Sequence, residues 1–275
     1  MMTERTRYWW SALVLWGMCV LAAAQQISPP QLQMGGLTAQ MKPESLEEEL
    51  SMGRLVSAQL IGAAKLVPDP ALQKYINLVG RRVANQTSRK DLNWAFGVID
   101  STALNAFAAP GGYILVTSGL FQSLETEDEL AGVLGHEVAH VVRKHHYRVL
   151  RKQQMLEFGA RAVQIQGESG EMANQLSSMV GQVMARGLDQ SSEYEADRDG
   201  MVFAARAGYD ASALIRVMAR LESGKPEAIS LLLATHPSPS QRANTMAQLV
   251  TPELEKAGVS SQAADRLRKF RTLDK

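Results

Sequence analysis

The pattern of apolar and polar positions divides the chain into a helical first part, a short β-rich part and a second helical part. Leucines recur at helical spacing between residues 46 and 60, which predicts an amphipathic helix near the start of a folded domain. Asp69 and Pro70 then supply an N-cap and a proline for the first helical position, so we expect a second helix that continues through Val83.

Between Trp94 and Phe121 the helical spacing gives way to β-branched and aromatic residues. Two runs, WAFGVID and YILVTS, flank the turn-forming segment APGG at 109–112, and this arrangement predicts a small antiparallel sheet. Beyond the sheet the apolar spacing is helical almost to the C-terminus, with polar interruptions at 166–172 and 235–240. The expected fold class is therefore α+β and predominantly helical.

The first 24 residues differ from the rest of the chain. Arg5 and Arg7 precede an uncharged apolar run, and three alanines close the segment at positions 22–24. This order is typical of a secretory signal peptide, so we expect residues 1–24 to be removed and the protein to be periplasmic. The alternative is an uncleaved N-terminal membrane anchor, although the apolar run is marginal for the roughly 20 residues that a spanning helix needs.

The rest of the sequence predicts one domain with an extension at each end. Residues 25–42 are rich in Pro, Gly and Gln and lack apolar periodicity, so we expect a flexible linker or arm there. A single folded domain is expected at 43–257, and a C-terminal helical tail at 258–275. No second apolar run of membrane-spanning length follows the first.

Charge and cysteine content narrow the range of functions. The chain has 29 basic and 28 acidic residues, so it lacks the strong positive charge that would favour nucleic acid as a partner. The only cysteine, Cys19, lies in the predicted signal peptide. The mature protein is therefore expected to use neither disulfides nor thiolate chemistry.

The segment Gly135–His146 reads GHEVAHVVRKHH and holds four of the chain's five histidines. A capping box at Thr126 and Glu129, followed by apolar residues at helical spacing, predicts that a helix runs through this segment. His136 and His140 are four positions apart, so both imidazoles project from one face of the helix and can bind one ion.

Glu137 lies about 100° round the helix from His136, where it can contact metal-bound water without binding the metal itself. In the H-E-x-x-H arrangement, zinc lowers the pKa of its water and the glutamate takes a proton as the water attacks a carbonyl. The alternative is a helix whose histidines repeat without a chemical role. The capped apolar helix and the central glutamate favour the metal site.

One candidate for the third metal ligand is His146. It stands six positions after His140, which is the spacing of the metzincin pattern H-E-x-x-H-x-x-G-x-x-H. That pattern turns the chain at a glycine, whereas this sequence has Arg143 and Lys144, which favour a continuing helix. Because a straight helix would carry His146 away from the ion, it is the weaker candidate.

The stronger candidate lies in SSEYEADRDG at 191–200, where Glu193 and Asp197 are four positions apart on a second expected helix closed by Gly208. Glu193 can complete a set of three protein ligands, and Asp197 can accept a hydrogen bond from the far nitrogen of a ligand histidine. Glu195 faces elsewhere. The alternative interpretation is a solvated acidic face.

Four segments occur in the order in which a known family has them: NAFAAPGGYILVTSGLF at 105–121, LGHEVAHVVRKH at 134–145, EYEAD at 193–197 and THPSPSQR at 235–242. On these segments, roughly residues 45–250 resemble the HtpX/BepA/Oma-like gluzincin metalloproteases, which are related to the CAAX prenyl protease. The resemblance implies a zincin-like domain in which the small sheet lies beside the H-E-x-x-H helix.

The resemblance also implies roles for individual residues. His136, His140 and Glu193 would bind one Zn²⁺ per chain, Glu137 would be the general base, and Asp197 would support the ligands without binding the metal. An extended substrate would pair by β-addition with the segment formed by Asn105, Ala106, Phe107 and Ala108.

Three further positions match the family without a settled role. His236 matches a histidine that is either a catalytic donor to the oxyanion of the transition state or a fourth zinc ligand in a closed, latent form. Arg242 matches the arginine of the same motif, and we expect it to support the site from outside the ligand set. His145 matches a recurrent position for which we expect a structural role.

The function that the resemblance implies is an exported zinc-dependent endopeptidase that hydrolyses unfolded or misassembled envelope proteins. Peripheral association with a membrane or with outer-membrane assembly machinery is a further expectation. The membrane helices of the HtpX branch and a C-terminal tetratricopeptide array are not expected here. Two alternatives stay open: a zinc-stabilised chaperone-like or latent binding module closed by His236, and a metzincin-like site that uses His146.

Overall fold

The computed structural model describes residues 44–161, 181, 187–223, 232–236, 239–252, 254, 267 and 269–270. The predicted signal peptide at 1–24 and linker at 25–42 lie outside the described residues, as does most of the predicted tail at 258–275, so these boundaries stay predictions. Of the helices in the described ranges, none is both long enough and apolar enough to cross a bilayer.

Two capped helices precede the sheet, as the apolar spacing predicts. Helix α2 (Leu46–Ala63) begins after Ser45, whose side chain accepts a backbone hydrogen bond of the first turn. Helix α3 (Pro70–Ala84) begins after Asp69, whose Oδ1 accepts two backbone hydrogen bonds at 2.8 and 3.1 Å. One face of α3 enters the main core through Leu72, Ile76, Val79 and Val83.

The predicted sheet has three strands in the order β1-β3-β2, which are β1 (Ala95–Ile99), β2 (Ala106–Ala109) and β3 (Tyr113–Thr117). Strands β2 and β3 are antiparallel, as predicted, and the 3-10 turn η2 (Pro110–Gly112) joins them. Strand β1 is parallel to β3, so the prediction of a wholly antiparallel sheet is wrong for this pair. The chain reverses twice between β1 and β3, and strand propensity does not reveal which strand becomes the neighbour.

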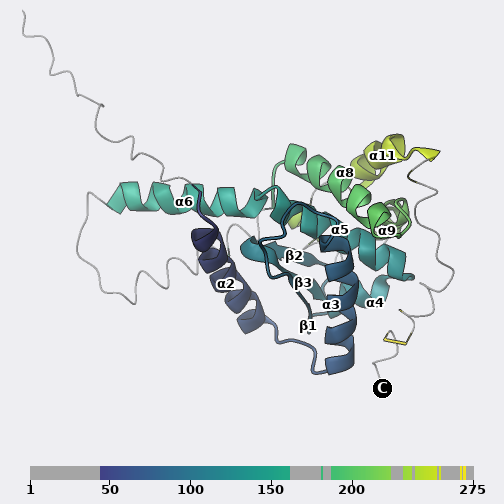
Figure 1. The fold of residues 1–275 in the computed structure, drawn as a ribbon, viewed down its shortest axis with the longest axis horizontal. Helices are drawn as coiled ribbons and strands as arrows, with labels where there is room; N and C mark the ends of the chain where they lie inside the picture. The colour runs from purple at the N-terminus through teal and green to yellow at the C-terminus, as the bar shows by residue number, and fades with distance from the viewer. Residues whose placement is uncertain are drawn as a thin grey trace, which may run out of the picture. The chain divides into compact units, whose positions relative to one another are not determined.

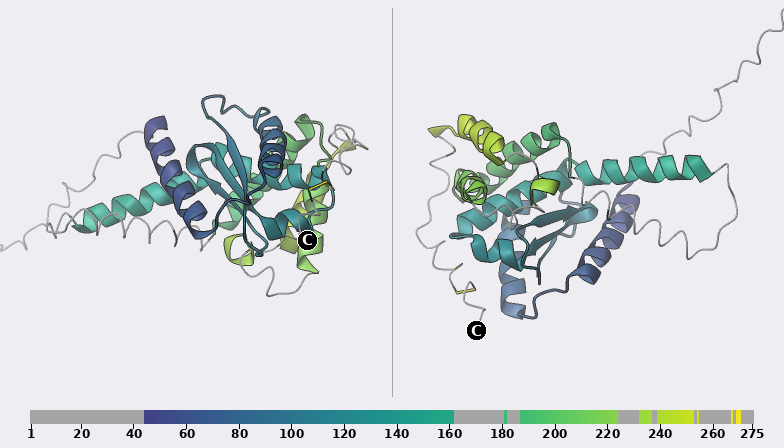
Figure 2. Two further views of the ribbon diagram at one scale, coloured as in Figure 1. Left: turned by 90° about the horizontal axis from the view of Figure 1, so that it is seen from below. Right: turned by 180° about the vertical axis from the view of Figure 1, so that it is seen from behind.

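The remaining described elements are helical (Figure 1), namely α4 (Ser118–Ser123), α5 (Glu127–Val142), α6 (His145–Arg161), α8 (Gln190–Arg206), α9 (Ala213–Glu222) and α11 (Pro239–Leu249). Helix α5 lies between the sheet and the pair α8 and α9, and it also contacts α3 (Figures 1 and 2). Every residue of α5 from Glu127 to Val141 is buried. The helix with the H-E-x-x-H segment is therefore the centre of the core.

The N-terminus of α5 follows the predicted cap in part. The Thr126 hydroxyl accepts a hydrogen bond from the Glu129 backbone N–H at 3.1 Å. The Glu129 carboxylate does not return to Thr126; it accepts from the Glu125 backbone N–H at 2.7 Å and pairs with Arg220 of α9 at 2.5 Å. The capping residue was thus predictable, whereas the partner of Glu129 comes from a remote helix.

The C-terminus of α5 corrects the expectation of a straight helix through His146. Helix α5 ends at Val142, and Lys144 adopts a left-handed conformation with φ of 58° before α6 begins at His145. The chain therefore turns here without a glycine. Lys144 pairs with Glu44 at 3.1 Å, so a contact with a segment remote in sequence accompanies a conformation that costs a non-glycine residue about 1–2 kcal/mol.

Helices α5 and α8 approach each other through a pair of glycines. A Cβ atom added at Gly135 would lie 2.7 Å from the Gly200 carbonyl oxygen, and one added at Gly200 would lie 2.7 Å from the backbone nitrogen of His136. Side chains at these two positions would hold the helices apart. Their absence lets α8 bring its polar residues against the histidines of α5.

Candidate metal centre

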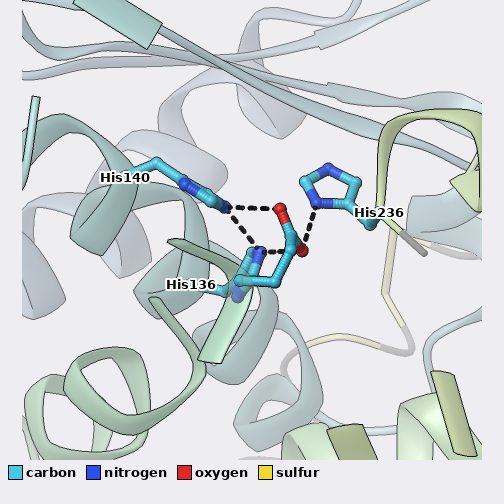
Figure 3. A group of neighbouring side chains, drawn as sticks. His136, His140 and His236 are labelled. Atoms are coloured by element: carbon cyan, nitrogen blue, oxygen red, sulfur yellow. Dashed lines mark hydrogen bonds and ion pairs between the residues drawn. The ribbon is translucent and has the colours of Figure 1, made fainter. Parts of the chain in front are cut away.

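His136 and His140 of α5 and Glu193 of α8 converge on one point in the core. Figure 3 shows the rings of His136, His140 and His236 around this point. The two Nε2 atoms of the histidines are 2.9 Å apart. The Glu193 carboxylate lies 3.6 Å from His136 Nε2 and 3.5 Å from His140 Nε2. All three residues are at most 4% exposed. The structure therefore brings together the three residues that the sequence proposed as ligands.

His236 joins this group from the segment that precedes α11. Its Nδ1 lies 2.9 Å from Glu193, and its Nε2 lies 3.8 Å from Glu137. One potential ligand atom from each of His136, His140, Glu193 and His236 falls within 4.8 Å of the others. The position is compatible with both roles considered for His236, because it reaches a proposed ligand and the proposed base.

The hydrogen bonds around this group fit a bound cation. His136 Nδ1 lies 2.9 Å from a carboxylate oxygen of Asp197, which can only accept when ionised, so Nδ1 carries a hydrogen. In the neutral ring that a metal requires, Nε2 then presents a lone pair. Within the described structure, Glu193 Oε1 is buried and has no hydrogen-bond donor. Lone pairs from two imidazoles and a carboxylate that face one another are the donor set of a zinc site.

Asp197 and Arg242 form a buried pair behind the histidines. Arg242 donates to Asp197 at 2.8 and 2.6 Å, and its Nη1 lies 2.9 Å from Glu193. Burial alone would raise the pKa of Asp197, but the hydrogen bonds and the charge of Arg242 outweigh burial and hold this pKa below its usual range. Arg242 thus keeps Asp197 ionised inside the core and adds to the groups that favour the charged form of Glu193.

The ionisation of the central carboxylates follows from their surroundings. Burial opposes the charge of Glu193, yet the neighbouring His236, His136 and Arg242 lower its pKa to about 2. Burial raises the pKa of Glu137, and the nearby histidines only partly oppose this effect. One oxygen of Glu137, Oε2, is buried without a hydrogen-bond partner among the described residues. Glu137 is therefore the carboxylate of the site that takes up a proton most readily.

A small apolar pocket, with a cavity volume of about 20 Å³, lies beside Glu137. Helix α9 contributes much of its wall, and Ala106 of β2 and His236 also line it; the α9 residues are Leu214, Val217, Met218 and Leu221. The sequence pattern predicted α9 only as part of the helical stretch that follows the sheet. Nothing in local spacing indicates that its apolar face meets the H-E-x-x-H glutamate.

The segment predicted to pair with substrate forms one edge of the described sheet. The Asn105 carbonyl accepts a hydrogen bond from the Thr117 N–H at 3.0 Å. Backbone N–H and C=O groups alternate in direction along an antiparallel strand. Those of Ala106 and Ala108 therefore point away from β3, whereas those of Phe107 point toward β3. The Asn105 side chain accepts a hydrogen bond from Thr235 at 3.2 Å, which ties this edge to the segment that carries His236.

The two remaining histidines differ in their contacts with the site. His145 Nδ1 lies 2.9 Å from His140 Nδ1, and His145 Nε2 lies 3.5 Å from Glu195. His146 is equally buried, but it is absent from the group of potential ligands, and its Nδ1 has no hydrogen-bond partner in the described part of the chain. Sequence reasoning missed the contact of Glu195, which it had placed facing elsewhere.

Comparison with known proteins finds one matching family model and several relatives. The model of peptidase family M48 matches residues 70–250. The chain is 30% identical over 236 residues to the beta-barrel assembly-enhancing protease of Yersinia pestis, covering 81% of this chain and 47% of the relative. It is 31% identical over 218 residues to the protein of the same name from Escherichia coli strain K12, covering 72% and 43%.

A more distant group of relatives has a different name. The chain is 28% identical over 184 residues to the mitochondrial metalloendopeptidase OMA1 of Arabidopsis thaliana, covering 67% of this chain and 37% of the relative. The chain thus spans less than half the length of each of these three relatives. The residues that the family model matches, 70–250, contain the proposed ligands and Arg242.

Proposed function

Because the chain belongs to peptidase family M48, we propose that it is a zinc-dependent endopeptidase that acts on unfolded or misassembled envelope proteins. The observation that carries the proposal is the convergence of His136, His140 and Glu193 around one point, with Glu137 beside them. The pattern HEVAH supplies two ligands and a base from one helix, and α8 supplies the third ligand.

In this proposal His136 Nε2, His140 Nε2 and a Glu193 oxygen hold the ion. When bound, zinc would supply Lewis acidity that makes the attacking water a stronger acid. Glu137 accepts a proton from the attacking water at a carboxylate oxygen and then delivers it to the amine of the leaving peptide. Its raised pKa suits both steps, because a weakly basic carboxylate would hold the proton too briefly to deliver it.

The substrate is proposed to lie in an extended conformation along β2. The backbone groups of Ala106 and Ala108 that point away from β3 would pair with the peptide backbone, and Asn105 and Phe107 would hold the strand in place against β3. An apolar side chain beside the scissile bond would lie against the apolar lining of the pocket next to Glu137. Recognition through backbone groups and one apolar side chain favours unfolded chains over a single sequence.

The cellular setting is also a proposal. The predicted signal peptide at 1–24 supports export to the periplasm, with an uncleaved membrane anchor as the alternative. Two of the relatives are named beta-barrel assembly-enhancing proteases, which supports peripheral association with outer-membrane assembly machinery as a working hypothesis.

A second candidate function is a latent form in which His236 closes the site. The 2.9 Å contact between His236 Nδ1 and Glu193 favours it, because a fourth protein ligand would take the position that a catalytic site leaves open for water. Such a protein would bind zinc and unfolded chains without hydrolysing them until His236 moves away.

The test is hydrolysis of casein by the purified full-length chain with and without a chelator, together with zinc analysis. Glu137→Gln should keep its zinc and lose activity by about 10²–10⁴-fold, while Glu47→Gln, the same change at an exposed position of α2, should retain it. Activity in His236→Ala combined with a silent wild type would establish the latent form. Cleavage that persists in Glu137→Gln or in the presence of chelator would contradict the peptidase mechanism.

A further inference from the structure

The two histidines of the H-E-x-x-H segment are held by different groups. His136 Nδ1 faces the Asp197 carboxylate at 2.9 Å. The corresponding nitrogen of His140 faces another imidazole, because His140 Nδ1 lies 2.9 Å from His145 Nδ1. Metal-bound histidines usually donate their second N–H to a carboxylate, a carbonyl or water. The imidazole of His145 is therefore an unusual hydrogen-bond partner for a proposed metal ligand such as His140.

The direction of the hydrogen bond follows from the lone pair that His140 needs at Nε2. A neutral imidazole has one N–H, so His140 with a free Nε2 must carry its hydrogen on Nδ1. It then donates to His145 Nδ1, which must be the unprotonated nitrogen of the second ring. The hydrogen of His145 consequently lies on Nε2, and that atom faces Glu195 at 3.5 Å.

The backbone around His145 is arranged for this contact. Lys144 adopts its left-handed conformation one residue earlier, so the chain folds back and the ring of His145 lies 5.1 Å from that of His140, centroid to centroid. On the far side, Glu195 of α8 also pairs with Arg143 at 3.4 Å. Three helices thus each contribute one residue to this series of contacts, namely His140 from α5, His145 from α6 and Glu195 from α8.

We propose that His145 is a positioning residue that orients His140 toward the metal, and that Glu195 fixes the tautomer of His145. The inference rests on the proposed metal site but concerns residues that lie outside the ligand set. It gives each ligand histidine its own support: a buried carboxylate paired with arginine for His136, and an imidazole backed by a half-exposed carboxylate for His140.

The competing explanation is that His145 merely fills space at the junction of two helices, and adjacent His146 provides a matched control. Both residues are 8% exposed, and the His146 ring lies 5.5 Å from that of His140, but no hydrogen bond joins the two rings. A bulk effect of replacing an imidazole would therefore be similar at both positions, whereas a loss of ligand orientation would follow only from His145.

The experiment measures zinc affinity by competition with a chromophoric chelator, and the visible spectrum of the Co²⁺ form, for the full-length chain. His145→Phe, which keeps a ring but no acceptor, should lower zinc affinity by about 10–100-fold and change the Co²⁺ spectrum. His145→Asn, which restores an acceptor oxygen, should recover most of the affinity. Glu195→Gln should show a smaller loss, and His146→Phe should match the wild type.

The outcomes separate this inference from the proposed function. Wild-type affinity in His145→Phe, an equal loss in His146→Phe, or a failure of His145→Asn to recover affinity would each overturn the positioning role while leaving the zinc site and the peptidase intact. A wild-type chain that binds no zinc would overturn both. Circular dichroism of each metal-free variant establishes that affinity is compared between folded proteins.

Discussion

Replacing Gly200 with alanine is the sharpest test of how the metal centre is assembled. The added Cβ would lie 2.7 Å from His136 N, 2.8 Å from Gly135 C and 2.9 Å from His136 Cα. All three are backbone atoms of α5, so none can rotate away as a side-chain atom could. For the shortest contact to reach 3.4 Å, the lower limit of ordinary van der Waals distances, the helices must separate by about 0.7 Å.

The displacement bears on the metal centre more than on stability. Overpacking costs about 1–3 kcal/mol, but alanine is about 1 kcal/mol more favourable than glycine in a helix, so the net loss of stability is about 0–2 kcal/mol. Glu193 lies seven residues, or about two turns, before Gly200 on the same face of α8. It would move with α8, and about 0.7 Å exceeds the roughly 0.2 Å tolerance of metal–ligand distances.

We therefore expect Gly200→Ala to lower zinc affinity by at least about tenfold, which corresponds to about 1.4 kcal/mol, with only a small change in the thermal midpoint of the metal-free protein. Gly62→Ala is the matched control, because this exposed glycine of α2 has no atom within 4 Å of the added Cβ. It should leave zinc affinity unchanged and add roughly 0.5–1 kcal/mol of stability. Wild-type zinc affinity in Gly200→Ala would refute the view that the glycine contact sets the position of Glu193.

Three further predictions follow from the site. The pKa of Glu193 is about 2 against the usual 4.5, so its contribution to the stability of the metal-free protein is complete above pH 4.5 and is lost as the pH falls toward 2. In Glu193→Gln the thermal midpoint should depend less on pH across this range. The same pH dependence in the variant and the wild type would contradict the assignment. Asp197→Asn leaves the buried Arg242 without its main partner and should lower the free energy of unfolding, measured with denaturant, by about 3–5 kcal/mol. Adding Arg242→Met should recover part of this loss. Equal stability of the wild type and Asp197→Asn would contradict a stabilising role of the pair. Met218→Ala widens the pocket beside Glu137 and should shift casein cleavage toward sites with bulkier apolar residues, while zinc affinity stays unchanged. Mass spectrometry of the products identifies the cleavage sites. An identical set of sites in the variant and the wild type would show that the pocket does not select substrate.

The parts of the site that the sequence predicted are those set by local spacing. His136, Glu137 and His140 occupy consecutive turns of one helix, so their geometry follows from the 3.6-residue period. The same reasoning joins Glu193 and Asp197 on α8. Local spacing placed these residues on two helix faces, and only the order of motifs indicated that the faces meet.

The features that could not be predicted depend on contacts between distant segments. Lysine favours helix, so the local sequence did not predict the left-handed conformation of Lys144. The partner of Lys144, Glu44, lies 100 residues away in the chain. The parallel pairing of β1 with β3 has the same origin, since strand propensity identifies strands without their partners. The sequence pattern placed Glu195 facing away from the site, because its contact, His145, lies on another helix.

The contacts of Arg242 have a consequence for the order in which the protein acquires its chemistry during folding. Arg242 meets Asp197 across 45 residues of chain and His136 across 106. Contacts of such long sequence separation require large loops to close and form slowly, whereas the helix with His136 and His140 can form early and locally. A nascent chain therefore holds only a pair of histidines until its last helices dock, and the metal centre is complete only when the domain itself is complete.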